Sequence, residues 1–302
     1  MADCTDLAFR LVAREHGMEL AFLEMVSAHS LLRRNAKTLD MMKTVPEDRP
    51  LGAQLLGSDP AMMGEAAAMA EEMGFDLIDL NFGCPAPKVV RPGSGAALLR
   101  KPDLAEAIFR SVVRCVRRVP VTLKTRTGFD DPSGREALEL ARRAQDCGLA
   151  AVTVHGRTRA QRYAGHADWE AIGRVKRAVS IPVIGNGSVM RGPDAAALAA
   201  ASGCDGVMLG RGSLGNPWLF KAAAAALDAE APAEPPSFEE RRRVLLRHMD
   251  LEFRFETERR ALLNMRRIAC WYFAGLPKVA AFRSAACVAT TPARMRALIE
   301  GF

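Results

Sequence analysis

The sequence lacks the features that would direct it to a membrane or out of the cell. No hydrophobic run approaches the roughly 18 residues of a membrane-spanning helix, and the N-terminus has no signal-peptide core. The seven cysteines are scattered, with no Cys-x-x-Cys pair. This pattern argues against a disulfide framework and against a zinc site. We therefore expect a cytoplasmic protein that binds neither a membrane nor a metal.

The composition is ordinary, but the charge is unevenly distributed. With 302 residues, 49% of them hydrophobic and 25% charged, the chain can form a barrel-sized domain and a smaller one. The segment Ser237–Phe302 carries 13 basic and 7 acidic residues, so it contributes nearly all of the net charge of +7. Such asymmetry favours a polyanionic partner for this last segment, although a solvated helical face would have the same composition.

Short hydrophobic segments alternate with segments of helical periodicity. The predicted strands are Leu20–Met25, Leu51–Leu55, Leu77–Asn81, Val121–Lys124, Ala151–His155, Pro182–Gly185 and Gly206–Gly210. The helical segments between them include Ala61–Met73, Ala105–Val116, Arg135–Cys147 and Pro193–Ala201. Strand–helix units that repeat about every 30 residues indicate a parallel sheet, either an open doubly wound sheet or a closed barrel.

Polar residues at the strand ends favour the barrel. Every predicted strand ends at, or is followed by, a residue that can bind a ligand: Glu24, Gln54, Asn81, Lys124, His155, Asn186 and Arg211. An open sheet gathers such residues at one switch point, whereas a barrel brings all strand ends to one rim. We therefore predict an α/β fold, a (β/α)8 TIM barrel.

The predicted barrel lacks its first strand. The chain begins with a loop in which Thr5 or Asp6 caps a helix that extends to about His16. We interpret Met1 as an internal methionine of a longer reading frame. At the other end, an alanine-rich stretch leads into a Pro-rich linker, and the predicted helices Phe238–Ala261 and Leu262–Phe273 follow. The predicted domains are thus a barrel (residues 1–230), a linker (231–236) and a small all-α domain (237–302).

The most distinctive stretch is Asp79-Leu80-Asn81-Phe82-Gly83-Cys84-Pro85, with Lys88 and Gly93-Ser94-Gly95 after it. Its strand ends in a Gly-Cys-Pro turn, which places a thiol just beyond the strand. That position suits catalysis, although a lone cysteine in a turn is more often a small buried residue.

Two glycine-rich loops indicate a phosphate site. Gly210-Arg211-Gly212 follows a hydrophobic strand and precedes the predicted helix Leu214–Leu227, and Asn186-Gly187-Ser188 follows the preceding strand. Backbone N–H groups, a helix N-terminus and an arginine fork all favour an anion there. Either loop alone would indicate no more than a turn.

The remaining candidates leave alternatives open. Lys124 could form a Schiff base, a structural ion pair, or a hydrogen bond to an electron-rich ring. His155 could be a satisfied core histidine, and Gln54 could bond a planar heterocycle or cap a strand. The arginines beside Tyr163 suit phosphates and stacked bases, or a solvated loop: they are Arg157, Arg159 and Arg162.

Taken together, the chain resembles the flavin-dependent tRNA-dihydrouridine synthases, in particular the bacterial B subgroup. The matching segments follow one another over most of residues 5–220: Thr5-Asp6-Leu7-Ala8-Phe9-Arg10, Glu24-Met25-Val26-Ser27-Ala28, Gln54-Leu55, Asn81-Phe82-Gly83-Cys84-Pro85, Gly93-Ser94-Gly95-Ala96, Lys124-Thr125-Arg126-Thr127-Gly128, His155-Gly156-Arg157-Thr158, Asn186-Gly187 and Gly210-Arg211. The region around Trp271-Tyr272 and Gly275-Leu276-Pro277 is more loosely similar to the family's helical tRNA-binding domain.

The resemblance implies FMN at the barrel mouth, reduced by NADPH or by NADH, and reduction of specific uridines in tRNA by a monomeric enzyme. It implies that Cys84 is the general acid, and that Asn81, Arg126 and Arg157 contact the uracil or the tRNA. The implied cofactor-binding residues are Met1, Ala2, Gln54, Lys124, His155, Asn186, Gly187, Ser188, Gly210 and Arg211. Ser188 stands where an aspartate is expected, and Arg267-Ile268 where a Lys-His pair is common.

Two rival functions remain. The first is an FMN barrel enzyme acting on a free pyrimidine, such as a dihydroorotate-type dehydrogenase, which has no use for a basic helical domain. The second is a non-catalytic tRNA-binding protein that has lost its flavin.

Overall fold

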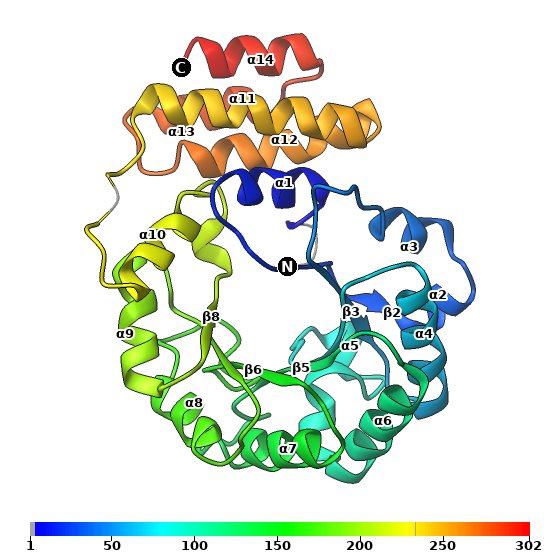
Figure 1. Cartoon of the computed structure of the whole chain (residues 1–302). Helices are drawn as coiled ribbons and strands as arrows, with labels where there is room; N and C mark the ends of the chain where they lie inside the picture. The colour runs from blue at the N-terminus through cyan, green and yellow to red at the C-terminus, as the bar shows by residue number, and fades with distance from the viewer. Residues whose placement is uncertain (1–3, 233) are drawn as a thin grey trace.

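Parallel strands form an incomplete ring in the computed structural model, which describes residues 4–232 and 234–302, and helices surround this ring (Figure 1). The strands are β1 (Ala21–Phe22), β2 (Val26–Ser27), β3 (Leu51–Leu56), β4 (Leu77–Phe82), β5 (Val121–Arg126), β6 (Ala151–His155), β7 (Val183–Asn186) and β8 (Gly206–Met208). The helices of the barrel part are α1 (Leu7–Glu15), α2 (Ala28–Leu32), α3 (Ala36–Met41), α4 (Pro60–Glu72), α5 (Pro87–Val90), α6 (Pro102–Cys115), α7 (Arg135–Asp146), α8 (Trp169–Lys176), α9 (Gly192–Ser202) and α10 (Leu219–Leu227), with 3-10 turns η1 (Gly95–Arg100) and η2 (Arg211–Ser213). The helical part contains α11 (Phe238–Phe255), α12 (Glu258–Tyr272), α13 (Val279–Cys287) and α14 (Pro292–Glu300).

The sheet confirms the predicted barrel topology. Its strands pair in parallel in the order β1-β3-β4-β5-β6-β7-β8, and β2 also pairs with β3. Within the described residues β1 and β8 do not pair with each other, so the ring stays open between them. The prediction of one strand over Leu20–Met25 is wrong, because two short strands flank Glu24. The Glu24 carboxylate instead accepts hydrogen bonds from the backbone N–H groups of Cys4 and Thr5 (2.8 and 2.9 Å).

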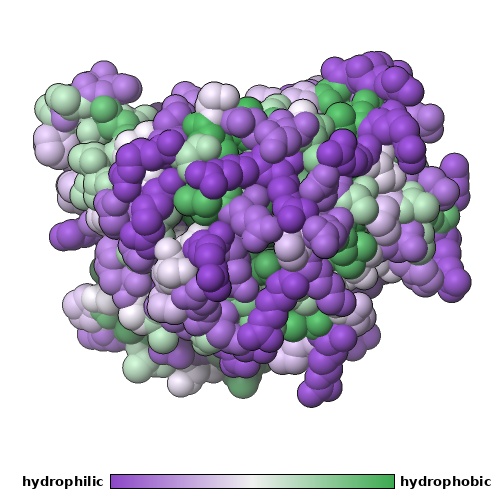
Figure 2. Space-filling model, turned by 90° about the horizontal axis from the view of Figure 1, so that it is seen from below, coloured by the Kyte–Doolittle hydropathy of each residue, from purple (hydrophilic) through white to green (hydrophobic). Residues whose placement is uncertain are grey.

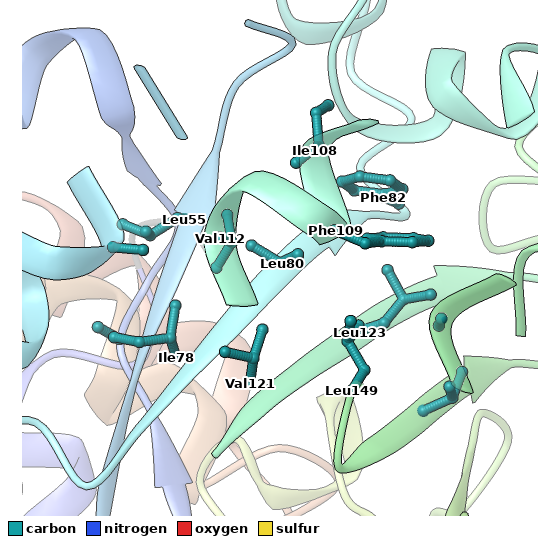
Figure 3. Packing of buried hydrophobic residues seen from close by; sticks show 14 of the residues in the cluster. Leu55, Ile78, Leu80, Phe82, Ile108, Phe109, Val112, Val121, Leu123 and Leu149 are labelled. Carbon is teal, nitrogen blue, oxygen red and sulfur yellow. The ribbon is translucent and has the colours of Figure 1, made fainter. Parts of the chain in front are cut away.

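Strand β4 shows how the sequence separates core from site. Its alternate residues Ile78, Leu80 and Phe82 are fully buried and pack toward α6 (Figure 3). The ring of Phe82 stacks on that of Phe109, with centroids 5.2 Å apart. Because successive side chains of a strand point to opposite faces, Asp79 and Asn81 face the interior of the barrel. The same alternation turns polar residues of β5 and β6 inward.

Helix α1 joins the barrel to the helical part. Asp6 caps it, as predicted, by accepting a hydrogen bond from the N–H of Phe9 (2.9 Å). The buried residues Leu11 and Val12 of α1 belong to the same hydrophobic cluster as the cores of α11 to α14. In Figure 1, α1 lies between the helical part and the open side of the ring. The predicted boundary at residues 231–236 therefore separates two stretches of sequence that both contribute to this cluster.

Two helix predictions are wrong at their boundaries. Helix α11 ends at Phe255 rather than Ala261, because Glu256 is extended (φ −114°, ψ 163°), and α12 starts two residues later. The helix predicted over Leu214–Leu227 begins only at Leu219. Between η2 and α10 the chain turns at Gly215 (φ 67°), where a Cβ would lie 2.4 Å from the backbone of Trp271. This turn needs glycine because it packs against α12.

The outer surface is mainly polar. Figure 2, which views the molecule from below the orientation of Figure 1, shows hydrophilic residues with scattered hydrophobic ones between them. Among the described residues no helix has the length and apolar character required to cross a bilayer.

Candidate active site at the ends of the strands

A hydrogen-bonded row with the buried Asp79 at its centre crosses β3, β4 and β5 inside the barrel. Sheet register places Gln54 beside Asp79, and Asp79 beside Thr122. The Gln54 amide Nε2 donates to Asp79 Oδ2 (2.7 Å), and the Thr122 hydroxyl donates to Asp79 Oδ1 (2.7 Å). Because the carboxylate accepts only, it fixes the orientation of the Gln54 amide, whose oxygen faces Asn81.

Asn81 connects this row to the cysteine loop. Its Nδ2 donates to Gln54 Oε1 (2.8 Å), and its Oδ1 accepts from the backbone N–H groups of Gly83 (3.2 Å) and Cys84 (3.0 Å). The side chain thereby closes the turn that carries the thiol. With a residual exposure of 8%, Asn81 lies at the floor of the site.

The ionisation of Asp79 and Lys124 is strongly perturbed. Burial raises the pKa of Asp79 to about 6, although the hydrogen bonds from Gln54 and Thr122 and the charge of Lys124 act in the opposite direction. Burial, followed by the charge of Arg126, lowers the pKa of Lys124 to about 7, with Asp79 opposing. Lys124 lies beside Asn81 across the sheet. Near neutral pH its amine can therefore exist in either protonation state.

Cys84 is partly buried on the loop after β4. Its carbonyl accepts a hydrogen bond from the N–H of Ala96 (3.1 Å). A Cβ at Gly95 (φ 59°) would lie 2.9 Å from that carbonyl oxygen, so the loop can fold back only with glycine there. The cysteine is thus held at Asn81 on one side and at the Gly95 turn on the other.

Arg126, the last residue of β5, joins the loops that follow β4 and β6. Its Nε donates to the carbonyl of Gly83 (2.8 Å), and its Nη1 donates to the carbonyls of Thr158 (2.9 Å) and Arg162 (3.0 Å). Burial lowers the pKa of Arg126 to about 10, so the guanidinium stays charged at neutral pH. It lies within electrostatic reach of Cys84.

His155 is neutral because it is buried among cations. Burial lowers its pKa far below the ordinary value, and so do the charges of Lys124, Arg126, Arg157 and Arg211. Arg157 Nη1 lies 3.3 Å from His155 Nε2. Since arginine can only donate, Nε2 accepts and the ring proton is assigned to Nδ1.

Arg157 also shapes the loop after β7. Its Nη2 donates to Ser188 Oγ (2.9 Å) and to the carbonyl of Gly165 (2.6 Å), and its Nε donates to the carbonyl of Ala164 (3.1 Å). Only 3% of Arg157 is exposed. Ser188 adopts a left-handed conformation (φ 62°), and its hydroxyl also accepts from the N–H of Ala167 (2.9 Å).

The two glycine loops differ in the space around them: Gly187 is tightly packed, whereas Gly210 faces open space. Gly187 has φ 117°, and a Cβ there would lie 2.7 Å from the His155 ring. A Cβ at Gly210 would find only Asn186 Nδ2, 4.0 Å away. The same Asn186 nitrogen donates to the carbonyl of Met208 (2.7 Å), which fixes the ends of β7 and β8 together.

A family model described as dihydrouridine synthase (Dus) matches residues 1–300. The chain belongs to the dihydrouridine synthase family. A probable tRNA-dihydrouridine synthase of Rickettsia bellii is 39% identical, covering 100% of this chain and 92% of the relative. The tRNA-dihydrouridine synthase B of Pasteurella multocida is 37% identical over 100% of this chain and 90% of the relative, and that of Xanthomonas campestris is 39% identical with the same coverage.

A solved structure of histamine dehydrogenase from Rhizobium sp. 4-9 has the same fold. It matches with a TM-score of 0.55 at 14% identity, over 81% of this chain and 46% of that chain. The predicted resemblance to the dihydrouridine synthases, including the B subgroup, is confirmed by the family model and by these relatives.

The structure brings most of the predicted site residues together at one rim of the barrel. Contacts connect Gln54, Asn81, Cys84, Arg126, His155, Arg157, Asn186 and Ser188 directly or through one neighbour. Arg211 lies over one face of the Tyr163 ring, with its guanidinium carbon 4.5 Å from the ring centroid, and Arg126 lies 5.8 Å from it. The predicted contacts of Met1 and Ala2 lie outside the described residues.

Sequence analysis missed Asp79 and Thr122 as site residues. Asp79 stands two residues before Asn81, so strand periodicity alone puts both on the same face. Thr122 has the same relation to Lys124. The prediction of a helix N-terminus directly after Gly210 is wrong, because η2 and a further turn separate Gly210 from α10.

Proposed function

We propose that this protein is a tRNA-dihydrouridine synthase, which reduces the C5–C6 double bond of uridines in tRNA with FMN and NADPH, NADH being the alternative reductant. The observation that carries the proposal is the hydrogen bond from Cys84 to Asn81. This bond runs from the backbone N–H of Cys84 to Asn81 Oδ1 (3.0 Å), so it supports the proposal by holding the cysteine loop next to the polar row at the barrel mouth. We further propose that the enzyme works as a cytoplasmic monomer.

The residues at the rim fit FMN. The charges of Lys124, Arg126, Arg157 and Arg211 all act on His155, so this end of the barrel favours an anionic group such as a phosphate. The open space at Gly210 allows close approach of such a group. We assign the phosphate to Asn186, Gly187, Ser188, Gly210 and Arg211, and the isoalloxazine ring to Gln54 and Lys124, with His155 beside them.

The protein's own contribution is to hold the base and to supply a proton. When bound, reduced FMN supplies a hydride to C6 of the uracil. Cys84 holds a proton at Sγ and gives it to C5, and the resulting thiolate takes a proton from solvent. Arg126, charged and within electrostatic reach, stabilises that thiolate. We assign the uracil edge to Asn81 and Arg126, and we propose that Arg157 acts by positioning His155 and Ser188.

The helical part supplies the tRNA contacts in this proposal. A uridine must leave its stack to reach the rim, which costs a few kcal/mol that backbone contacts can offset. Several arginines of residues 237–302 are exposed and form no ion pair with the described residues, among them Arg243, Arg259 and Arg283. They are free to meet phosphates.

The test is an assay with the purified full-length protein. We expect a yellow protein that releases FMN on denaturation and forms dihydrouridine in tRNA from a strain that lacks this gene, measured by mass spectrometry. Free uridine and dihydroorotate serve as competing substrates. Turnover of a free pyrimidine without tRNA activity would replace the proposal with the small-molecule alternative. A colourless protein that takes up no FMN would overturn it.

A further inference from the structure

A second group of buried titratable residues lies away from the strand ends, where α1 meets α11. Asp6 caps α1, and His248 and Glu252 are one turn apart on α11. Each offers one potential metal-ligand atom, and these atoms lie within 4.8 Å of one another. Only 2% of His248 and 0% of Glu252 are exposed. Nothing in the proposed reaction uses these three residues.

Two polar atoms in this group have no hydrogen-bond partner. They are His248 Nε2 and Glu252 Oε1, and they face each other at 3.9 Å, which is too long for a hydrogen bond. Buried polar atoms of this kind are rare, because leaving one unsatisfied costs about 1–3 kcal/mol. Either tautomer of His248 leaves Nε2 unpaired at this distance.

The other polar atom of each side chain is already held in place. Tyr272 Oη lies 3.1 Å from His248 Nδ1, Asn264 Nδ2 donates to Glu252 Oε2 (3.0 Å), and the N–H of Phe9 donates to Asp6 Oδ1. With the phenol oxygen accepting from Nδ1–H, the lone pair of Nε2 points at the carboxylates. Metal-binding side chains are typically held in orientation by hydrogen bonds of this kind to their other polar atom.

No basic side chain balances the two carboxylates. Across residues 4–232 and 234–302, no lysine or arginine forms an ion pair with Asp6 or Glu252. The nearby Arg10 is engaged elsewhere, with Asp48 (2.8 Å) and the carbonyl of Thr5 (3.0 Å). Two carboxylates and an imidazole nitrogen therefore converge on one point, where either a metal cation or a shared proton would offset the negative charge.

We propose that Asp6, His248 and Glu252 bind a divalent transition metal ion, with Zn²⁺ as the best match. One imidazole nitrogen, two carboxylate oxygens and a water make a four-coordinate set that suits this ion. The absence of Cys-x-x-Cys pairs excludes only thiolate sites and does not bear on this one. A cavity of about 190 Å³ has Asp6 in its wall, whereas His248 and Glu252 do not line it. The ion would fasten α1 to the helical part, independently of the proposed function.

The alternative is that Asp6 and Glu252 share a proton instead of a metal ion, and two isosteric variants separate the two cases. Glu252→Gln mimics a protonated carboxyl group, and Asp6→Asn keeps the helix cap. Both should weaken Zn²⁺ binding more than about tenfold. Asp59→Asn, which alters the exposed cap of α4, is the matched control and should leave binding unchanged.

The experiment measures zinc in the full-length protein by plasma mass spectrometry after dialysis, and Tm after EDTA treatment with and without added ZnCl₂. We expect one equivalent of zinc and a rise in Tm with ZnCl₂ in the wild type and in Asp59→Asn only. Co²⁺ in place of Zn²⁺ should give a visible spectrum that Glu252→Gln lacks. Wild-type protein with no more zinc than Glu252→Gln, or Glu252→Gln more stable than wild type in ZnCl₂, would overturn the proposal and favour the shared proton. If a variant does not fold, the number of zinc ions bound per wild-type protein still decides between the metal ion and its absence.

Discussion

The side-chain oxygen of Asn81 accepts a hydrogen bond of 3.0 Å from the backbone N–H of Cys84. The nitrogen of the same amide donates to Gln54 on the neighbouring strand, and Gln54 in turn is oriented by Asp79. The position of the thiol is therefore set by side chains of β3 and β4 as well as by its own loop. Changes at Asn81 should act through Cys84.

Replacing Asn81 by alanine should lower kcat by about 10²-fold, because it frees the turn that carries the thiol. Single-turnover dihydrouridine formation measures this. In the Cys84→Ala background the same substitution should cost less than in the wild type, because only the proposed contact of Asn81 with the uracil edge is then left to lose. Additive losses in the double variant would show that Asn81 acts without Cys84.

Cys84→Ala should bind flavin and tRNA normally and lose about 10²-fold or more in turnover, the usual contribution of a general acid. The flavin spectrum, tRNA affinity by filter binding, and single-turnover rates measure the three properties. Cys287→Ala, which removes an exposed thiol from α13, is the matched control. Full activity of Cys84→Ala would remove the general-acid assignment.

Lys124 should make stability depend on pH. Its pKa is about 7 in the folded protein, against an ordinary value of 10.5. Between these values the unfolded chain binds a proton that the folded chain does not. The free energy of unfolding therefore rises with pH, by at most about 1.4 kcal/mol per pH unit from this one group.

In Lys124→Met the free energy of unfolding should rise less steeply between pH 7.5 and about 9.5 than in the wild type. The variant should also be more stable than the wild type toward neutral pH, because the charge on the buried lysine costs stability there. Urea denaturation of the flavin-free proteins across this range measures the slopes. Lys37→Met, which removes an exposed lysine, is the control. Parallel curves for wild type and Lys124→Met would contradict the lowered pKa.

Arg243, Arg259 and Arg283 lie on three different helices of the helical part, and all three are exposed. Replacing them together by alanine should weaken tRNA binding. It should also make the plot of the logarithm of the tRNA binding constant against the logarithm of the salt concentration less steep, by about 0.9 for each lost phosphate contact. Point substitutions are preferable to deletion of this part, because deletion would expose Leu11 and Val12 of α1.

The control for that variant is the triple substitution of Arg114, Arg117 and Arg142, which are exposed on the barrel. It should leave both affinity and salt dependence unchanged. An equal effect of the two triple variants would show that tRNA is attracted by overall charge rather than by the helical part.

Local patterns in the sequence determined most of the barrel and of its rim. Alternation in β4 separates Ile78 and Leu80 from Asp79 and Asn81, and this period depends only on the extended backbone. The polar residues after successive strands meet because parallel strands end at the same side. The capping of α1 by Asp6 is likewise a contact over three residues.

Only the tertiary structure decided which of these groups act together. The ring contacts of Tyr163, the pairing of Gln54 with Asp79, and the convergence of Asp6 with Glu252 all join segments far apart in the chain. The same holds for α1, which packs with helices more than 200 residues later along the chain, and for Gly215, whose turn is fixed by the backbone of Trp271. Periodicity reports which face of an element is buried, but not which element covers it. That choice depends on the packing of the whole chain.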